Sequence, residues 1–292
     1  MWLIVTTDSR SLGSNLMNSS IEYKSRLSEV FSRASPTYDH IGPAFFSYFG
    51  NKLVEFADLR KGSSVLDIAC GRGAVLFPSS EAVSNSGEVV GIDISKGMIV
   101  QTNQEIQRRK IENTQVFVMD AERLDLSNSH FDYVLCGLCL FFFPDLMRAL
   151  REFFRVLKPG GYIIASTFKK QKDDELTKEW DQLYESFEDR VAEVPKVETS
   201  NLNTGREIKQ RFIEAGFDRP EVIIRRKMFY YRDVDEWWQT AWSHGHRAYL
   251  ERIPSEYLPD FKTRAIDLLR KEETDRGIPF KWELLLSKAR KP

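Results

Sequence analysis

The sequence predicts an α/β fold, a Rossmann-like doubly wound and mostly parallel seven-stranded sheet with helical cap insertions. Two observations predict it. From residue 60 to 168, short runs of apolar and β-branched residues alternate with helical patterns. After residue 168, longer helical stretches surround two further apolar runs. Strands that alternate with helices indicate a parallel sheet with helices on both faces, and the later runs complete its seven strands.

The first five strands are expected where short apolar runs end in small or acidic residues. Helical patterns separate them at about 73–83, 95–110 and 145–157. Because connections between parallel strands are right-handed, few topologies remain for these elements. The expected strands are VLDIA (65–69), GEVVGIDI (87–94), TQVFVMD (114–120), FDYVLCGLCL (131–140) and GGYIIASTF (160–168).

The second half of the chain adds helical insertions at about 172–200 and 233–274, with a sixth strand at 220–231 and a final strand at 280–289. Between them, TGREIKQRFIEAGF (204–217) has the start and stop signals of a helix. Thr204 and Glu207 form a capping box pattern, and Gly216 is a typical helix end.

The chain is therefore expected to have three parts. Residues 1–18 are expected to be a disordered tail, and residues 19–59 an N-terminal helical lid. Residues 60–292 are expected to form the core with its helical insertions.

The charge balance weighs against a nucleic-acid binder. Lys and Arg number 42, Asp and Glu number 43, and the formal net charge is -1. Proteins that bind nucleic acid usually show a clear basic excess. No apolar run approaches the ~20 residues of a membrane-spanning helix, and no basic segment precedes the short apolar start, as a secretory signal requires.

The cysteines are too few for a disulfide framework. Cys70, Cys136 and Cys139 are the three present, and the last two lie in an apolar run that predicts buried, reduced side chains. A reducing compartment, the cytoplasm, is expected. No Cys, His and Asp cluster has metal-ligand spacing, so no metal is predicted. A homo-oligomer is compatible with the sequence.

The segment VLDIACGRG (65–73) is expected to build a ligand site. Its strand ends at Ala69, and a helix follows Gly73. Gly71 and Gly73 allow a tight turn and a close approach of the backbone to a ligand, because they have no side chain. In open α/β sheets, ligands bind beyond the carboxyl ends of the strands, where the strand order reverses.

Two classes of adenosine cofactor compete for this loop. A nicotinamide site favours the pattern G-x-G-x-x-G, but Leu76 stands at the third glycine position. Asp67 just before the loop disfavours a pyrophosphate and suits a cationic amino-acid end, such as that of S-adenosylmethionine (SAM). A NAD-dependent oxidoreductase remains an alternative.

Acidic residues end the next two expected strands as well. Asp93 can accept hydrogen bonds from both ribose hydroxyls of an adenosine ligand. Asp120 can accept from the adenine amino group, and Ala121 offers a backbone donor. The alternatives are structural: Asp67 and Asp93 can instead cap the helices that follow them.

The combination VLDIACGRG, GIDIS, MDAE and LKPGGYIIAS, together with FSRASPTYDHIG, resembles the class I SAM-dependent methyltransferase family, in its ubiquinone/menaquinone and small-molecule branch. The resemblance covers about residues 30–168. It implies SAM as the cofactor and methyl transfer to a small molecule. The residues that it places at the cofactor are Tyr38 in a lid, Asp67, Ala69, Gly71 and Gly73 near the methionine part, Asp93 and Ile94 at the ribose, Met98, Asp120 and Ala121 at adenine, and Cys136 and Leu138 near the methyl group.

Methyl transfer from SAM needs mainly positioning of the acceptor, so no dominant catalytic residue is required. Trp238, Trp242 and His246 are spaced four apart and would share one face if a single helix crosses Gly245. An aromatic pocket of Phe141, Phe142, Trp238 and Trp242 suits an apolar, aromatic or prenyl-like acceptor, with His244 or His246 as a general base. Core packing of these aromatic residues, and a non-catalytic SAM-binding protein, are the alternatives.

Overall fold

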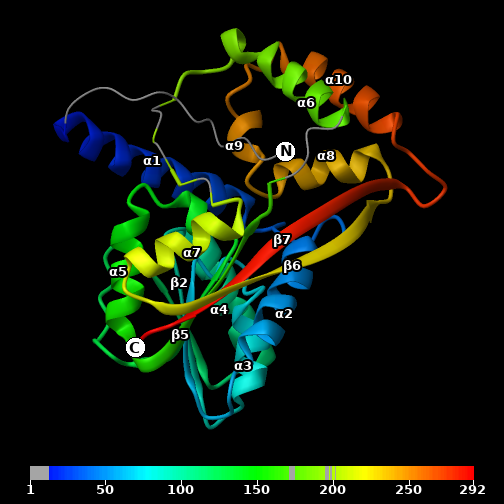
Figure 1. Cartoon of the computed structure of the whole chain (residues 1–292). Coiled ribbons are helices and arrows are strands. Elements are labelled where there is room, and N and C mark those ends of the chain that lie inside the picture. Colours follow the sequence, from blue (N-terminus) through cyan, green and yellow to red (C-terminus); the bar gives the residue numbers. More distant parts are fainter. Residues whose placement is uncertain (1–12, 171–174, 195–196, 198, 201) are drawn as a thin grey trace. The chain divides into compact units, whose positions relative to one another are not determined.

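A computed structural model of the chain describes residues 13–170, 175–194, 197, 199–200 and 202–292 (Figure 1). Its seven-stranded sheet has the order β3-β2-β1-β4-β5-β7-β6. The pairs β1–β2, β1–β4, β2–β3 and β4–β5 are parallel, and β5–β7 is antiparallel. The predicted fold class is thus confirmed. The strands are β1 (Ser64–Ile68), β2 (Glu88–Asp93), β3 (Thr114–Val118), β4 (Phe131–Gly137), β5 (Leu157–Phe168), β6 (Asp218–Tyr231) and β7 (Ile278–Arg290).

The strand order reverses at β1, because the chain proceeds outward through β2 and β3 and then returns to pair β4 on the other side of β1. Val65, Leu66 and Ile68 are fully buried there. A strand buried on both faces has a nearly continuous apolar sequence, as VLDIA does. The exception is Asp67, an acid in the most buried strand of the sheet.

The chain divides into two compact units. The sheet unit comprises Phe46–Lys170, Glu198–Arg226 and Glu283–Pro292, and the helical unit comprises Met1–Phe45, Gln171–Val197 and Lys227–Trp282. The later ranges of the helical unit overlap the segments 172–200 and 233–274, whose role as insertions stays a prediction.

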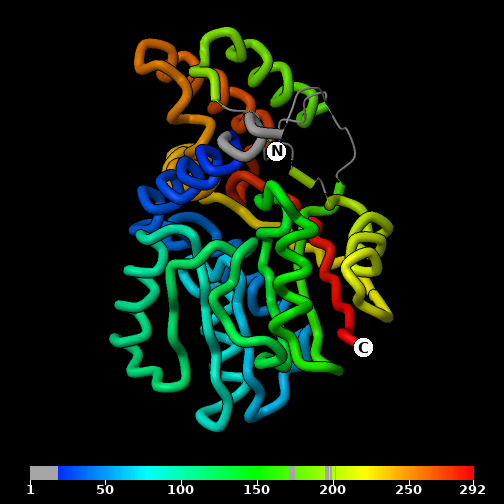
Figure 2. Tube along the Cα trace, turned by 90° about the vertical axis from the view of Figure 1, so that its left-hand side faces the viewer, coloured from blue at the N-terminus to red at the C-terminus, as the bar shows by residue number. Residues whose placement is uncertain are grey.

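In the sheet unit, helices cover both faces of the sheet. Figure 1 shows α5 (Leu146–Val156) and α7 (Gly205–Glu214) on one side and α2 (Phe45–Ala57) and α3 (Leu76–Val83) on the other. Figure 2, turned by 90°, looks onto the face of the sheet that α5 and α7 cover. Phe153 of α5 and Phe212 of α7 pack into one core cluster with strand residues such as Ile163. The remaining helix, α4 (Lys96–Arg109), connects β2 to β3.

The N-terminal helices divide differently from the predicted lid. Most of the tail predicted at 1–18 lies outside the described residues, and Gly13 already begins α1 (Gly13–Ala34). Helix α2 belongs to the sheet unit except for its first residue. A Cβ atom on Gly50 would lie only 2.1 Å from the Ala74 carbonyl oxygen, so this glycine lets α2 approach the loop after β1.

The helical unit has an aromatic core of its own. Its helices are α1, α6 (Glu175–Glu185), α8 (Val234–Trp242), α9 (Arg247–Leu250) and α10 (Leu258–Arg270), with the short turn η2 (Glu188–Arg190). Phe187 and Phe261 are fully buried, with ring centroids 5.3 Å apart. Tyr184 packs against both Tyr249 and Phe261.

The predicted capping box at α7 is confirmed. The Thr204 hydroxyl accepts a hydrogen bond from the Glu207 N–H, and the Glu207 carboxylate accepts one from the Thr204 N–H. Gly216, just after the helix, has a φ of 95° in the left-handed region that suits a helix end.

We predict that Thr204→Ala lowers the free energy of unfolding by about 1 kcal/mol, because the Glu207 N–H loses its cap. Urea denaturation followed by circular dichroism measures this. The control is Ser127→Ala, which removes an exposed hydroxyl of the same unit and should change stability by less than about 0.5 kcal/mol. Equal losses in the two variants would contradict the capping role.

Candidate functional site

Two non-glycine residues adopt strained backbone conformations at adjacent strand ends. Ala69 after β1 has a φ of 52°, and Leu138 after β4 has a φ of 55°. β1 and β4 are neighbours, so both lie at the edge where the strand order reverses. Such conformations cost about 1–3 kcal/mol each and gather at functional sites. The Leu138 N–H is held by the Ser166 hydroxyl at 3.0 Å.

The two glycines of the loop after β1 have different tasks, although both have positive φ. A Cβ atom on Gly73 would lie 2.3 Å from the Phe77 ring, so Gly73 is needed for packing at the start of α3. Among the described residues, a Cβ atom on Gly71 would meet only the Ala69 carbonyl oxygen, at 4.0 Å. Within that part of the chain, Gly71 therefore leaves space for a ligand to approach the backbone. The Thr102 hydroxyl of α4 donates to the Gly71 carbonyl at 2.6 Å and holds the loop.

Asp93 ties this loop to the end of β2. One carboxylate oxygen accepts from the Gly71 N–H at 2.9 Å, and the other accepts from the Ser95 N–H at 2.8 Å. The N-cap of α4 is Ser95, whose hydroxyl accepts from the Met98 N–H. Asp93 is thus not the helix cap that the structural alternative required. Burial raises the pKa of Asp93 to about 6, against the lowering effect of both hydrogen bonds.

Asp67 is the second buried acid of the site. It is only 1% exposed, and burial, followed by the charge of Asp93, raises the pKa of its carboxyl well above the ordinary value. A hydrogen bond from the Leu76 N–H at the start of α3 acts in the opposite direction. The other oxygen, Oδ2, is buried without a hydrogen-bond partner among the described residues. The helix-capping alternative therefore accounts for part of the Asp67 carboxylate only.

The third acid lies beyond its strand rather than in it. β3 ends at Val118, and the half-buried Asp120 accepts a hydrogen bond from the Glu122 N–H in the following turn. The Met119 N–H donates to the Asp93 carbonyl at 3.0 Å, which brings this turn beside the end of β2. Ala121 is buried in the same turn.

The remaining predicted cofactor residues of the sheet unit lie near these acids in the chain. Ile94 is half-buried, and Met98 in the first turn of α4 is 1% exposed. Both follow Asp93, as the predicted adenosine contacts require, but their contact with a ligand stays a prediction.

The cysteines after β4 differ from the expectation. Cys136 and Cys139 are buried as predicted, but they are joined by a disulfide rather than reduced. The turn between them, which contains Leu138 with its positive φ, brings their Cα atoms to 6.0 Å, within the usual range for a disulfide. The prediction rested on cysteine number and not on this local geometry. Cys70 is free and buried.

Aromatic residues gather beyond the ends of β4 and β5. Phe141 packs against Phe142 with ring centroids 4.7 Å apart and against Phe168 at 5.6 Å. Phe141 is buried and Phe142 is half-buried. The strand predicted at 131–140 ends earlier, at Gly137, and the turn η1 (Leu140–Phe142) follows it. Phe168 is an aromatic neighbour that the sequence analysis did not single out.

The other predicted site residues belong to the helical unit. Tyr38 lies edge-on to Phe31, with centroids 6.1 Å apart. Trp238 and Trp242 are neighbours on α8, at 6.2 Å. His246 does not share their helix face, because α8 ends at Trp242 and does not cross Gly245, the condition on which that possibility depended.

Both histidines are half-buried, and His246 packs against Tyr184 and Trp237 of the aromatic core of the helical unit. The Tyr184 hydroxyl and His246 Nε2 share a hydrogen bond of 2.9 Å. Burial lowers the pKa of both His244 and His246 to about 3, so each is neutral at pH 7.

Three polar residues that hold the site were missed by the sequence analysis. Thr102 and Ser95 secure Gly71 and Asp93, and Ser166 holds Leu138. Only Ser95 had a local signal, as a serine before a helix. Thr102 and Ser166 act across elements, which no local pattern encodes.

The part of the chain that the structure describes contains neither a metal site nor a membrane-spanning helix. No group of three or more His, Cys, Asp or Glu side chains in that part of the chain is arranged to hold a metal ion. No helix found there combines the length and the apolar character needed to cross a membrane.

Comparison with known proteins agrees with this geometry. A family model described as a methyltransferase domain matches residues 59–216, which contain all three acids and the glycine loop. The structure of the YcgJ protein from Bacillus subtilis has the same fold, with a TM-score of 0.56 and 21% identity over 84% of this chain and 98% of that chain.

Two curated relatives are similar in sequence. Demethylmenaquinone methyltransferase from Staphylococcus epidermidis is 31% identical over 218 residues, 69% of this chain and 88% of that protein. Aklanonic acid methyltransferase DauC from Streptomyces sp. (strain C5) is 40% identical over 141 residues, which are 48% of this chain and only 64% of that protein. The chain belongs to the class I SAM-dependent methyltransferase family, in its small-molecule and quinone branch, as the sequence analysis predicted.

Proposed function

We propose that this protein transfers the methyl group of SAM to a small-molecule acceptor, at an oxygen, nitrogen or carbon atom. The observation that carries the proposal is the buried Asp67 carboxylate. Its Oδ2 atom has no hydrogen-bond partner among the described residues, and the strand of Asp67 leads into the loop that contains Gly71. A buried, unpaired carboxylate is costly unless a cation or a donor compensates it. The amino-acid end of SAM carries such a cation.

The other residues fit the remaining parts of the cofactor. Asp93 already accepts two backbone hydrogen bonds, one on each oxygen. An ionised carboxylate has about four lone-pair positions, so two remain for the ribose hydroxyls. Ile94 would border the ribose, and Met98 and the turn at Asp120 and Ala121 would hold the adenine. Ala69, Gly73, Cys136 and Leu138 would border the methionine part.

When bound, SAM supplies a methyl group on a sulfonium, and loss of that methyl group leaves a neutral thioether. The chain has therefore mainly to orient the acceptor and exclude water. The strained backbone at Ala69 and Leu138, with the Leu138 N–H held by Ser166, supports such positioning. His244 and His246 stay the proposed proton acceptors. Their lowered pKa leaves them unprotonated at neutral pH, although weak as bases.

We propose an aromatic or prenyl-like acceptor. The Phe141 and Phe142 pair would form an apolar wall beyond the end of β4. Trp238 and Trp242 of the helical unit stay predicted acceptor residues, and Tyr38 stays a predicted cofactor residue. The names of the two curated relatives, which refer to an acid and to a quinone precursor, are consistent with an aromatic acceptor. An oxidoreductase is not favoured, because Leu76 is fully buried at the position where a nicotinamide site needs glycine. A cytoplasmic location and a homo-oligomeric state remain predictions. Light scattering would measure the oligomeric state.

The direct test is methyl transfer from radiolabelled SAM to a panel of hydroxylated aromatic acids, quinols and aromatic amines. We expect turnover of at least one aromatic class. Calorimetry with S-adenosylhomocysteine (SAH) separates the two parts of the proposal, since SAH binding without any turnover would leave a SAM-binding protein that is not an enzyme for these acceptors. No binding at all would refute the cofactor assignment.

Asp67→Asn should weaken SAH binding by about 10- to 100-fold, because a hydrogen bond to a charged group contributes about 1.5–3 kcal/mol. The unliganded chain should keep its stability, since a neutral amide replaces a carboxylate that burial disfavours. Calorimetry and thermal unfolding measure the two effects.

The matched control for that variant is Asp132→Asn. Asp132 belongs to β4 but accepts hydrogen bonds from the Ser64 N–H and from Lys158, at the opposite end of the sheet. Its variant should bind SAH normally. Unchanged affinity in Asp67→Asn would remove Asp67 from the proposed site.

SAH affinity should fall as the pH is lowered through about 6, where Asp93 becomes protonated. One proton coupled to binding changes Kd by up to about tenfold per pH unit below that pKa. Folding should respond with the opposite sign. The folded-state pKa lies above the ordinary 3.8, so this group stabilises the unliganded fold at low pH and the contribution is lost as the pH rises through 6.

Calorimetry between pH 5 and 8 checks the binding profile, with Asp93→Asn as the reference. That variant should bind weakly, with the step near pH 6 removed. An unchanged step in Asp93→Asn would assign the titration to another group.

A further inference from the structure

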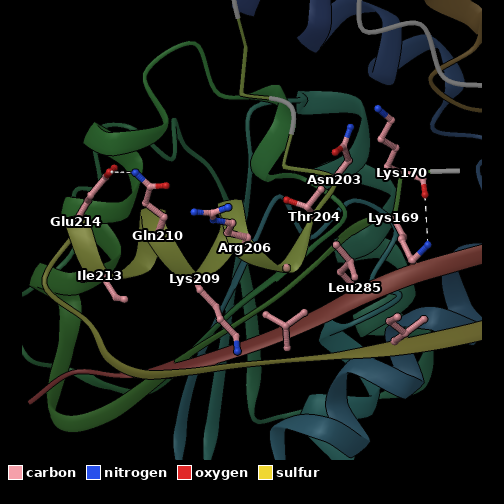
Figure 3. Close-up of a pocket in the computed structure, with 13 residues that line it drawn as sticks. Lys169, Lys170, Asn203, Thr204, Arg206, Lys209, Gln210, Ile213, Glu214 and Leu285 are labelled. Carbon is pink, nitrogen blue, oxygen red and sulfur yellow. Dashed lines mark hydrogen bonds between the residues drawn. The ribbon is translucent and has the colours of Figure 1, made fainter.

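A groove lies outside the cofactor edge, along α7 of the sheet unit (Figure 3). Its volume is about 790 Å³. That volume falls within the ~300–1,000 Å³ typical of small-molecule sites. None of the predicted cofactor residues lines it. Its walls come from the end of β5, from α7 and the residues before it, and from β6 and β7.

The lining of the groove includes an apolar surface. Val222 and Ile224 of β6, Leu285 of β7 and Ile213 of α7 contribute to it. Ile213 is 59% exposed and Ile224 is 38% exposed, whereas the opposite face of α7 buries Phe212 in the core. Apolar side chains thus line the groove on two sides, and a hydrocarbon ligand would remove their exposed area from water.

The polar part of the lining is positively charged. Lys170, Arg206 and Lys209 form no ion pair with any described residue, whereas Lys169 pairs with Glu283 at 3.2 Å. Figure 3 shows Lys209 extending from α7 toward the strands. The acid of the lining, Glu214, already accepts from Gln210 and Arg211 and does not neutralise these cations.

The start of α7 is not the source of this charge, because its capping box already occupies the Thr204 and Glu207 N–H groups. The charge comes from the side chains of Lys170, Arg206 and Lys209. The overall charge of the chain is only -1, so this excess is local. Three cations with no ion pair in the described part of the chain, beside an apolar wall, complement a molecule that has one anionic head and one hydrocarbon part.

We propose that this groove is a second ligand site, which binds a small amphipathic acid. Its carboxylate lies against Arg206 and Lys209, and its hydrocarbon part covers Val222, Ile224 and Leu285. The proposal goes beyond methyl transfer and does not depend on it. Its size favours one small molecule over a long polyanion, which would need a more extended basic surface.

The test is calorimetric titration of the full chain with dodecanoate below its micellar concentration. Acetate tests the head alone, and dodecanol tests the chain alone. We expect dodecanoate to bind more tightly than either, and its Kd to rise with added KCl, because salt screens exposed charges. Absent binding, or equal binding of dodecanol and dodecanoate, would overturn the proposal.

Two variants locate the site. The double variant Arg206→Gln and Lys209→Gln should raise the Kd for dodecanoate by about tenfold, since each exposed pair contributes up to about 1 kcal/mol. Ile213→Ser should weaken binding through the apolar wall. The matched control is Arg211→Gln on the same helix, whose side chain pairs with Glu214 and does not line the groove.

SAH binding is measured on every variant. It should stay unchanged, which shows that the variants fold and separates this site from the cofactor site. Loss of dodecanoate binding in Arg211→Gln to the same extent as in the double variant would place the acid elsewhere and refute the groove.

Discussion

The cofactor edge depends on one carboxylate, that of Asp93. It is the point where the end of β2, the glycine loop after β1 and the first turn of α4 are held together, through the N–H groups of Gly71 and Ser95. The parallel pairing of β1 with β2 brings those segments to the same edge of the sheet. Without an acceptor there, the Gly71 and Ser95 N–H groups would lose their partner at the end of two buried strands, and such groups are costly to leave unsatisfied.

The two buried carboxylates of this edge, Asp67 and Asp93, also have an electrostatic cost, which a bound cation would reduce. Asp67 lies close enough to Asp93 for the charge of Asp93 to raise its pKa further, and both are buried. Two acids in such a position disfavour the unliganded ionised state. A bound cation would reduce that cost at Asp67, while Asp93 keeps its backbone donors. Stability and binding thus oppose each other at this edge, as is common where a site is built for a charged ligand.

Much of the sheet unit could be predicted because its signals are local. VLDIA predicts a central strand, since burial on both faces makes a parallel strand continuously apolar, and Thr204 with Glu207 predicts a helix start. Asp67, Gly71 and Asp93 could be grouped because successive parallel strands end at one edge. The supporting hydroxyls of Thr102 and Ser166 could not, since they act between elements that are far apart in the chain.

The departures from expectation have the same physical origin. Trp238, Trp242 and His246 could share one face only if a single helix crossed Gly245, but the backbone leaves the helix after Trp242. Cys136 and Cys139 were expected to be reduced because the cysteines are few. Cysteine number does not predict the turn that brings these two together. Spacing predicts which residues can share a face only while the backbone stays regular. At strand ends and helix ends, where this fold gathers its polar groups, the local φ angles of residues such as Leu138 decide the outcome instead.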